Sequence, residues 1–211
     1  MPARTSQALE LVAPHCDLVD RLRFIPPAAG VRGMFFQNIE AQVERMGQSS
    51  AYRAYFPDDR YSSLPYYPLS EFMVRLACAG AVVSPLRQGQ HEPGEFSSRQ
   101  LHDGMRAITR GHATTFVQSL LGRVLLRLLA RDPVRLTEQG LASRRQTHRY
   151  GRWTFQRVSS SHVQVIYEDE YLWIDSAVHG AAEGTYVTCL PEVRLETELT
   201  GRFAGRTHIR W

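Results

Sequence analysis

The sequence predicts an α+β fold in which N-terminal helices pack on a C-terminal antiparallel sheet of four or five strands. Two patterns support this prediction. Up to about residue 148 the apolar residues recur at helical spacing, whereas after residue 150 they alternate with polar residues, as in half-buried strands. With 211 residues, of which 43% are hydrophobic and 22% charged, the chain has the composition of an ordinary globular protein with a substantial core.

The first 30 residues show little periodicity and end in the stiff segment IPPAAG, so we expect residues 1–30 to be an extension. Residues 31–211 are then expected to form a single domain, with a helical part at 31–148 and a sheet part at 150–211. The helices expected from apolar spacing lie, in order, at 32–45, 52–56, 69–83, 97–110, 113–130 and 132–146, with a loop at 58–68.

Local signals set the limits of these elements. Pro85 ends the third helix, Gly111 separates the fourth from the fifth, and Pro133 suits the first turn of the sixth. The pattern then becomes that of strands. We expect a hairpin from 153–158 and 162–169, a helix at 178–190, and a second hairpin from 192–199 and 206–211.

The helix expected at 178–190 contains HGAAEGTYVTC, with Gly180 and Gly184 four residues apart. Each glycine inside a helix costs about 1 kcal/mol relative to alanine. Residues four apart lie one above the other on a helix. The two glycines therefore predict a flat strip that another backbone can approach closely; the alternative is that the strip forms one wall of a ligand cavity. His179 and Cys189 flank this helix, but their spacing matches no rule for metal ligands.

Charge is unevenly distributed. All 25 basic residues are arginine. Residues 106–157 contain eleven arginines and two acidic residues, whereas residues 162–198 contain eight acidic residues and one arginine. Such asymmetry suits internal docking, self-association or an anionic partner. The arginines that we expect to form an anion or partner surface, unless they simply form a solvated face, are Arg123, Arg127, Arg131, Arg144, Arg145 and Arg149.

Large apolar side chains of the helical part could line a pocket for a hydrophobic ligand, although a closed core has the same composition. The residues that would line this pocket are Phe35, Phe36, Phe72, Met73, Phe116 and Leu120.

Motifs for catalysis are absent from the sequence. It contains no GxSxG, HExxH, GxGxxG or P-loop, and its three cysteines lie far apart. We therefore expect no enzymatic activity, no catalytic residues and no metal site. A run of 18 apolar residues is also absent, and we expect a cytoplasmic protein.

Several segments resemble the myxobacterial paralogous family of unknown function, over roughly residues 30–211. They are RGMFFQNI at 32–39, YYPLSEFMVRLA at 66–77, Gly104 to Phe116, and LGRVLLRLLARDP at 121–133. HGAAEG followed by EVRLETE is similar to the four-vinyl-reductase domain, whose fold relatives are the TRAPP tethering subunits and the heme nitric-oxide/oxygen-binding domain. The first family usually has an aromatic residue where His112 stands.

These resemblances imply a non-enzymatic regulatory or sensory domain that binds a small hydrophobic ligand, a protein partner or both, and that forms a homodimer. The alternatives are a ligand-free interaction scaffold like the TRAPP subunits and, less favoured, a nucleic-acid-binding surface on the basic segment 106–157, where aromatic residues interleave. The heme-binding relatives use a helix histidine and a Tyr-x-Ser-x-Arg motif. His112 opens an apolar helix, but this chain has no such motif, so we expect no heme and no other cofactor.

Overall fold

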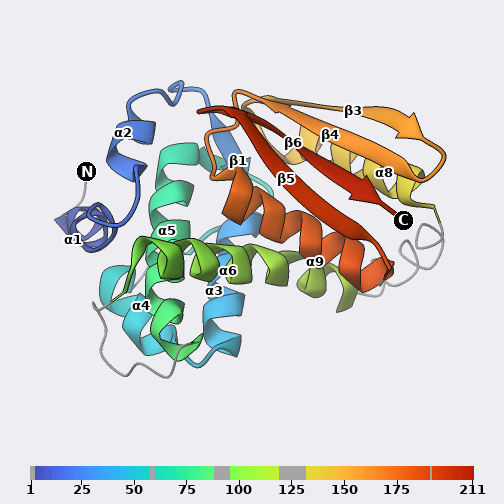
Figure 1. Ribbon diagram of the computed structural model, residues 1–211. Coiled ribbons are helices and arrows are strands. Elements are labelled where there is room, and N and C mark those ends of the chain that lie inside the picture. The colour runs from blue at the N-terminus through green and yellow to red at the C-terminus, as the bar shows by residue number, and fades with distance from the viewer. Residues whose placement is uncertain (1–2, 58–59, 88–95, 119–131, 191) are drawn as a thin grey trace. The chain divides into compact units, whose positions relative to one another are not determined.

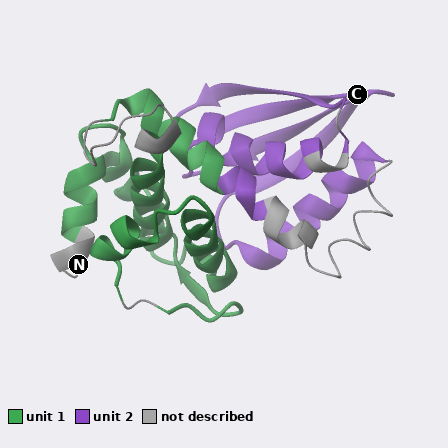
Figure 2. Ribbon diagram, turned by 90° about the horizontal axis from the view of Figure 1, so that it is seen from below, with its two compact units in different colours: residues 1–108 green, residues 109–211 purple. Residues whose placement is uncertain are grey.

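A computed structural model describes residues 3–57, 60–87, 96–118, 132–190 and 192–211 (Figure 1). The chain forms two units, residues 1–108 and residues 109–211, so that the division lies inside one helix (Figure 2). The single domain predicted for residues 31–211 stays a prediction.

Unit 1 is mainly helical. Its helices are α1 (Ala3–Val12), α2 (Leu18–Leu22), α3 (Gly33–Arg45), α4 (Ser49–Tyr55), α5 (Leu69–Arg87) and the first half of α6 (Ser98–Gln118). Two short strands, β1 (Gly30–Arg32) and β2 (Tyr66–Pro68), pair antiparallel. The sequence predicted neither strand, because three residues are too few to show a period of two.

The segment predicted to be an extension is part of unit 1. Helix α1 packs against α5, and Ala8, Val12 and Leu18 are fully buried. These apolar residues recur at intervals of four and six, which is a weak signal over so few residues.

Helix α6 continues through Gly111, where the sequence predicted a break. One glycine costs a helix only about 1 kcal/mol, which tertiary packing easily offsets. Within unit 1, α6 crosses α5 so closely that a methyl group at Gly104 would lie 2.1 Å from the carbonyl oxygen of Gly80. The part of the predicted helix 113–130 that follows residue 118 lies outside the described residues.

Unit 2 contains the predicted antiparallel sheet. The strands β3 (Arg152–Ser159), β4 (His162–Glu168), β5 (Arg194–Gly201) and β6 (Ala204–Arg210) are ordered β3-β4-β6-β5, and every neighbouring pair is antiparallel. Both predicted hairpins, and with them the four-stranded sheet, are confirmed. Helix α8 (Pro133–Thr147) packs against β3, and α9 (His179–Cys189), which follows the π-helical turn η1 (Ile174–Val178), packs against β5.

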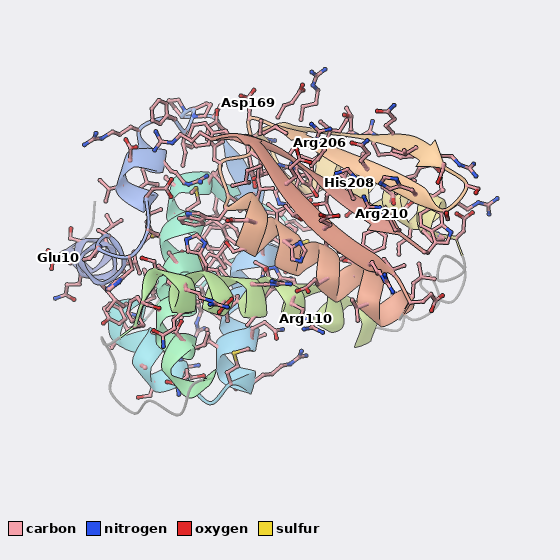
Figure 3. All side chains as sticks on the ribbon, in the orientation of Figure 1. Glu10, Arg110, Asp169, Arg206, His208 and Arg210 are labelled. Atoms are coloured by element: carbon pink, nitrogen blue, oxygen red, sulfur yellow. The ribbon has the colours of Figure 1, made fainter. Side chains whose placement is uncertain are left out.

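The two faces of this sheet differ in polarity. On the face toward the helices, Val163, Val165 and Tyr167 of β4 are buried. The other face carries cross-strand ion pairs, which include Arg152 with Glu168 and Arg210 with Glu196. Figure 3 shows Arg206, His208 and Arg210 along β6. The strands therefore follow the alternation of apolar and polar residues that predicted them.

Candidate functional site

An open groove of about 660 Å³ lies between the last turns of α8 and the beginning of β3, entirely within unit 2. We call it the α8–β3 groove. It is lined by four arginines, three aromatic side chains and no acidic residue. The lining residues are Leu141, Arg144, Arg145, His148, Arg149, Tyr150, Gly151, Arg152, Trp153, Thr154 and Phe155.

A buried ion pair holds the groove together. The carboxylate of Glu170, which is fully buried, accepts hydrogen bonds from the Arg144 guanidinium (2.9 Å) and from the indole nitrogen of Trp153 (2.7 Å). Its second oxygen accepts from the main-chain nitrogen of Leu172 (3.1 Å). Removing one partner of such a pair leaves an uncompensated buried charge, at a cost of about 3–5 kcal/mol. Glu170 therefore fixes where α8 and β3 meet.

The guanidinium of Arg144 also lies over two rings of the groove. Its central carbon is 4.6 Å from the ring centre of Tyr150 and 4.5 Å from that of Trp153. Such cation–π contacts are stronger in a desolvated site than in water. Burial and the nearby Glu170 charge raise the pKa of Tyr150 well above its ordinary value, so its hydroxyl stays protonated. The arginine and the two rings form a rigid floor.

His148 ends α8 at the same place. Its Nδ1 lies 2.8 Å from the hydroxyl oxygen of Thr147, and its ring meets that of Tyr150 edge-on at 5.6 Å. Burial and the charge of Arg144 lower the pKa of His148 well below its ordinary value. The imidazole is therefore neutral at physiological pH and adds no charge to the groove.

The structure separates the arginines that were predicted to form an anion or partner surface. Arg145 and Arg149 are exposed at the groove, as is Arg152, which pairs with Glu168. Arg144 is buried and its charge is balanced by Glu170, so the prediction that it belongs to a surface is wrong. The other three predicted members, Arg123, Arg127 and Arg131, lie outside the described residues.

The basic and acidic segments thus meet within unit 2. Arg144 and Arg152 from the basic segment pair with Glu170 and Glu168 from the acidic one. Of the three roles left open for the charge asymmetry, internal docking accounts for these four residues. Arg145 and Arg149 are exposed where they line the groove.

The glycine helix α9 lies close to the part of α6 that belongs to unit 2. A methyl group at Gly184 would lie 2.1 Å from the carbonyl oxygen of Arg110, and Gly180 is buried one turn earlier. At the start of α9, His179 Nδ1 lies 2.7 Å from the hydroxyl oxygen of Thr197 on β5. At Gly184 the strip therefore meets a helix backbone.

Four residues of the predicted apolar pocket are described with their side chains, and all four lie in unit 1. Phe36, Phe72 and Met73 are buried and Phe35 is half-buried. The ring of Phe36 meets that of Phe72 at 5.3 Å, and the ring of Phe35 meets it at 6.4 Å. The side chains of Phe116 and Leu120 lie outside the described residues, and the pocket stays a prediction.

The fold is similar to that of solved H-NOX proteins. The Fe(II) unliganded H-NOX protein from K. algicida is 12% identical, with a TM-score of 0.54 over 85% of this chain and 95% of that chain. The H-NOX domain from Shewanella oneidensis in the Fe(II)CO ligation state is also 12% identical, with a TM-score of 0.54 over 85% of this chain and 97% of that chain. At this identity the likeness shows a shared α+β fold. The resemblance to four-vinyl-reductase and TRAPP proteins stays a prediction.

His112 is the helix histidine that would be the candidate heme ligand, and the absence of heme stays a prediction. Burial lowers the pKa of His112 to about 4, so its imidazole is neutral. A flat ring system needs about 3.5 Å of clearance on each face. Where α6 crosses α9, a methyl group at Gly184 would lie 2.1 Å from the carbonyl oxygen of Arg110, so a porphyrin has no space between the two helices at that point. The sequence also has no Tyr-x-Ser-x-Arg motif.

Two further observations apply to the described part of the chain alone. No three or more His, Cys, Asp or Glu side chains gather there in a way that could hold a metal ion. None of its helices is both long and apolar enough to cross a membrane.

A comparison with curated proteins gives no match. The comparison with family models gives one, which covers residues 25–211 and so includes both α5 and the whole of unit 2. The chain belongs to the family described as "Protein of unknown function (DUF2378)".

Proposed function

We propose that the chain is a non-catalytic regulatory or sensory domain that recognises an anionic ligand with an apolar portion in the α8–β3 groove. The observation that carries the proposal is the composition of the groove, in which exposed arginines surround an aromatic floor and no acidic residue is part of the lining. The similarity to the H-NOX fold adds support, because the solved neighbours are described in Fe(II)CO and Fe(II)NO ligation states.

Two exposed arginines of the groove can reach a ligand. Glu170 neutralises the buried Arg144, and Glu168 pairs with Arg152. Arg145 and Arg149 are both exposed at the groove. A guanidinium suits carboxylate, sulfonate and phosphate groups, because its planar fork donates two parallel hydrogen bonds.

The apolar portion of the ligand would lie on the floor. Trp153 and Phe155 are half-buried and present part of their rings to the groove. The polar groups beneath them are engaged with one another, since Glu170 accepts three hydrogen bonds and His148 contacts Thr147. Because these polar side chains hold the aromatic floor in place, the groove favours ligand binding over catalysis.

The test uses 8-anilinonaphthalene-1-sulfonate, a flat apolar probe with one sulfonate, titrated against the folded protein. We expect saturable binding that the double variant Arg145→Glu/Arg149→Glu weakens by at least about tenfold. Arg194→Glu/Arg202→Glu is the matched control, because it changes net charge equally at exposed positions elsewhere in unit 2. Equal weakening by both variants, or no binding, would contradict the proposal.

The rival interpretation, a scaffold that binds no ligand, predicts that the probe leaves the melting temperature unchanged. A ligand of the native state raises stability by RT ln(1 + [L]/Kd), so a rise in melting temperature with probe concentration favours the groove. The homodimer predicted from the fold group stays a prediction, and a native mass spectrum of the same sample tests it.

A further inference from the structure

Strand β3 is at an edge of the four-stranded sheet, since it pairs with β4 and no other described strand. The hydrogen bond from the main-chain nitrogen of Trp211 to the carbonyl oxygen of Ser161 (3.1 Å) continues the ladder between β4 and β6. In an antiparallel ladder every second residue bonds to a given neighbour. Val163, Val165 and Tyr167 therefore bond to β6, and the residues between them bond to β3.

The register then assigns the direction of each main-chain group in β3. Arg152, Thr154 and Gln156 face the bonding residues of β4. The N–H and C=O groups of Trp153 and Phe155 point the other way, toward the open side of the sheet. Among the described residues, no main-chain or side-chain hydrogen bond uses these outward groups.

Open space runs along this edge. The α8–β3 groove reaches it at Trp153, Thr154 and Phe155. A second groove of about 460 Å³ lies at the far end of β3, beside Arg157 and Ser160. An edge strand that presents outward main-chain groups to open space is a template for another strand.

We propose that β3 accepts an extended acidic peptide of a partner protein as an additional strand of the sheet. The proposal rests on the proposed function, because it names the class of ligand that the α8–β3 groove recognises. A strand laid against β3 satisfies the outward N–H and C=O groups of Trp153 and Phe155 together. It also brings its side chains alternately to the two faces of the sheet.

The two faces specify what those side chains would be. On the groove side lie Leu141, Trp153 and Phe155, which favour apolar residues, with Arg145 and Arg149 at one end. On the other face Arg152, Thr154 and Gln156 are exposed. Acidic residues suit the arginine positions, so the peptide would alternate acidic and apolar residues.

Two other occupants fit less well. A second copy paired antiparallel through β3 would bring another groove lined by the same four arginines, and by no acidic residue, to this edge. Two such grooves lack the charge complementarity that an acidic peptide provides. A nucleic acid offers phosphate acceptors to the arginines, but its backbone has no donors for the outward C=O groups of β3.

The experiment titrates the full-length protein with a fluorescently labelled, end-blocked peptide of alternating glutamate and valine. Two further peptides carry N-methyl groups on either the odd or the even residues. We expect one N-methyl pattern to abolish binding and the other to preserve it, because only every second peptide N–H would meet β3. Hydrogen exchange should slow at the amides of Trp153 and Phe155.

Variants of the protein provide an independent measurement. Phe155→Pro removes an outward N–H that does not bond to β4, and an edge strand tolerates proline at such a position. Binding should fall well below that of Phe155→Ala, which removes the same ring and keeps the N–H. Arg145→Glu/Arg149→Glu should weaken the peptide by at least about tenfold, and Arg194→Glu/Arg202→Glu should not.

Each remaining result is decisive. Equal binding of both N-methyl peptides would overturn strand addition, as would binding of a thymidine oligonucleotide at this edge in place of the peptide. Binding of the sulfonate probe without the peptide would overturn strand addition and leave the proposed function standing. Failure of both probe and peptide would overturn both proposals.

Discussion

In the part of the chain that the structure describes, each unit buries one arginine between aromatic rings, and the two arginines differ in what surrounds them. In unit 1 the Arg75 guanidinium lies 4.1 Å from the ring centre of Phe56 and 4.8 Å from that of Tyr61. In unit 2 Arg144 lies over Tyr150 and Trp153 at similar distances. A buried arginine among aromatic rings therefore does not by itself indicate a site.

The difference lies in the acidic partner and in access. Glu71, whose carboxylate is 3.6 Å from Arg75, keeps 38% of its side chain exposed, whereas Glu170 is fully buried beside Arg144. Arg75 is buried in the core of unit 1, but Arg144 lines an open groove. The same chemistry serves stability in one unit and forms the floor of a groove in the other.

The largest expected effect on stability comes from replacing Glu170. Glu170→Gln leaves the charge of Arg144 buried without a counter-charge, and we expect the free energy of unfolding of unit 2 to fall by about 3–5 kcal/mol. All three tryptophans lie in unit 2, so urea unfolding followed by tryptophan fluorescence measures it. The double variant Arg144→Met/Glu170→Gln should recover much of the loss; additive losses would show that the pair is not coupled.

Acid is expected to destabilise unit 2 through His112 and His148. Burial lowers the pKa of His112 from 6.5 to about 4 and that of His148 in the same direction. Below pH 6.5 the unfolded chain therefore binds protons that the folded unit does not. The free energy of unfolding should fall by up to about 1.4 kcal/mol per pH unit and histidine as pH drops from the unfolded to the folded pKa. His112→Phe should reduce this slope in urea unfolding at stepwise lower pH, and an unchanged slope would refute the assignment.

Both units also contain a glycine at a close helix crossing, which gives a second comparison. A methyl group would lie 2.1 Å from a carbonyl oxygen at Gly104 in unit 1 and at Gly184 in unit 2, but would touch nothing within 4 Å at Gly140. We expect Gly104→Ala and Gly184→Ala each to destabilise by about 1–3 kcal/mol. Gly140→Ala should stabilise α8 by about 0.5–1 kcal/mol, and thermal melts that rank the three otherwise would count against these crossings.

The smallest loss of stability is expected where the acidic partner is hydrated. Arg75→Met leaves Glu71 in contact with water, so we expect a loss of about 1 kcal/mol, well below that of Glu170→Gln. Hydrogen exchange of unit 1 peptides measures the loss. A cost equal to that of Glu170→Gln would remove the distinction between the two arginines.

Periodicity predicted the sheet and most helices because it is a local property. It did not separate Arg144 from Arg145, which are neighbours in sequence and opposite in burial. A signal was present: Arg144 follows the buried Thr137 and Leu141 at intervals of seven and three, on one face of α8. No pattern in the sequence indicated that Glu170 is buried, because this residue ends an acidic run of the kind that is typical of a surface turn. Its burial depends on Arg144 and Trp153, which only the tertiary fold brings to it.

The most direct test of the α8–β3 groove uses the three indole N–H signals in a ¹⁵N spectrum as the sulfonate probe is added. Trp153 lines the groove, Trp173 is buried elsewhere in unit 2, and Trp211 lines the second groove. The account predicts a saturable shift of the Trp153 signal, with amide shifts concentrated between Arg145 and Phe155. Shifts at Trp211 with Trp153 unchanged, or no saturable shift, would contradict it.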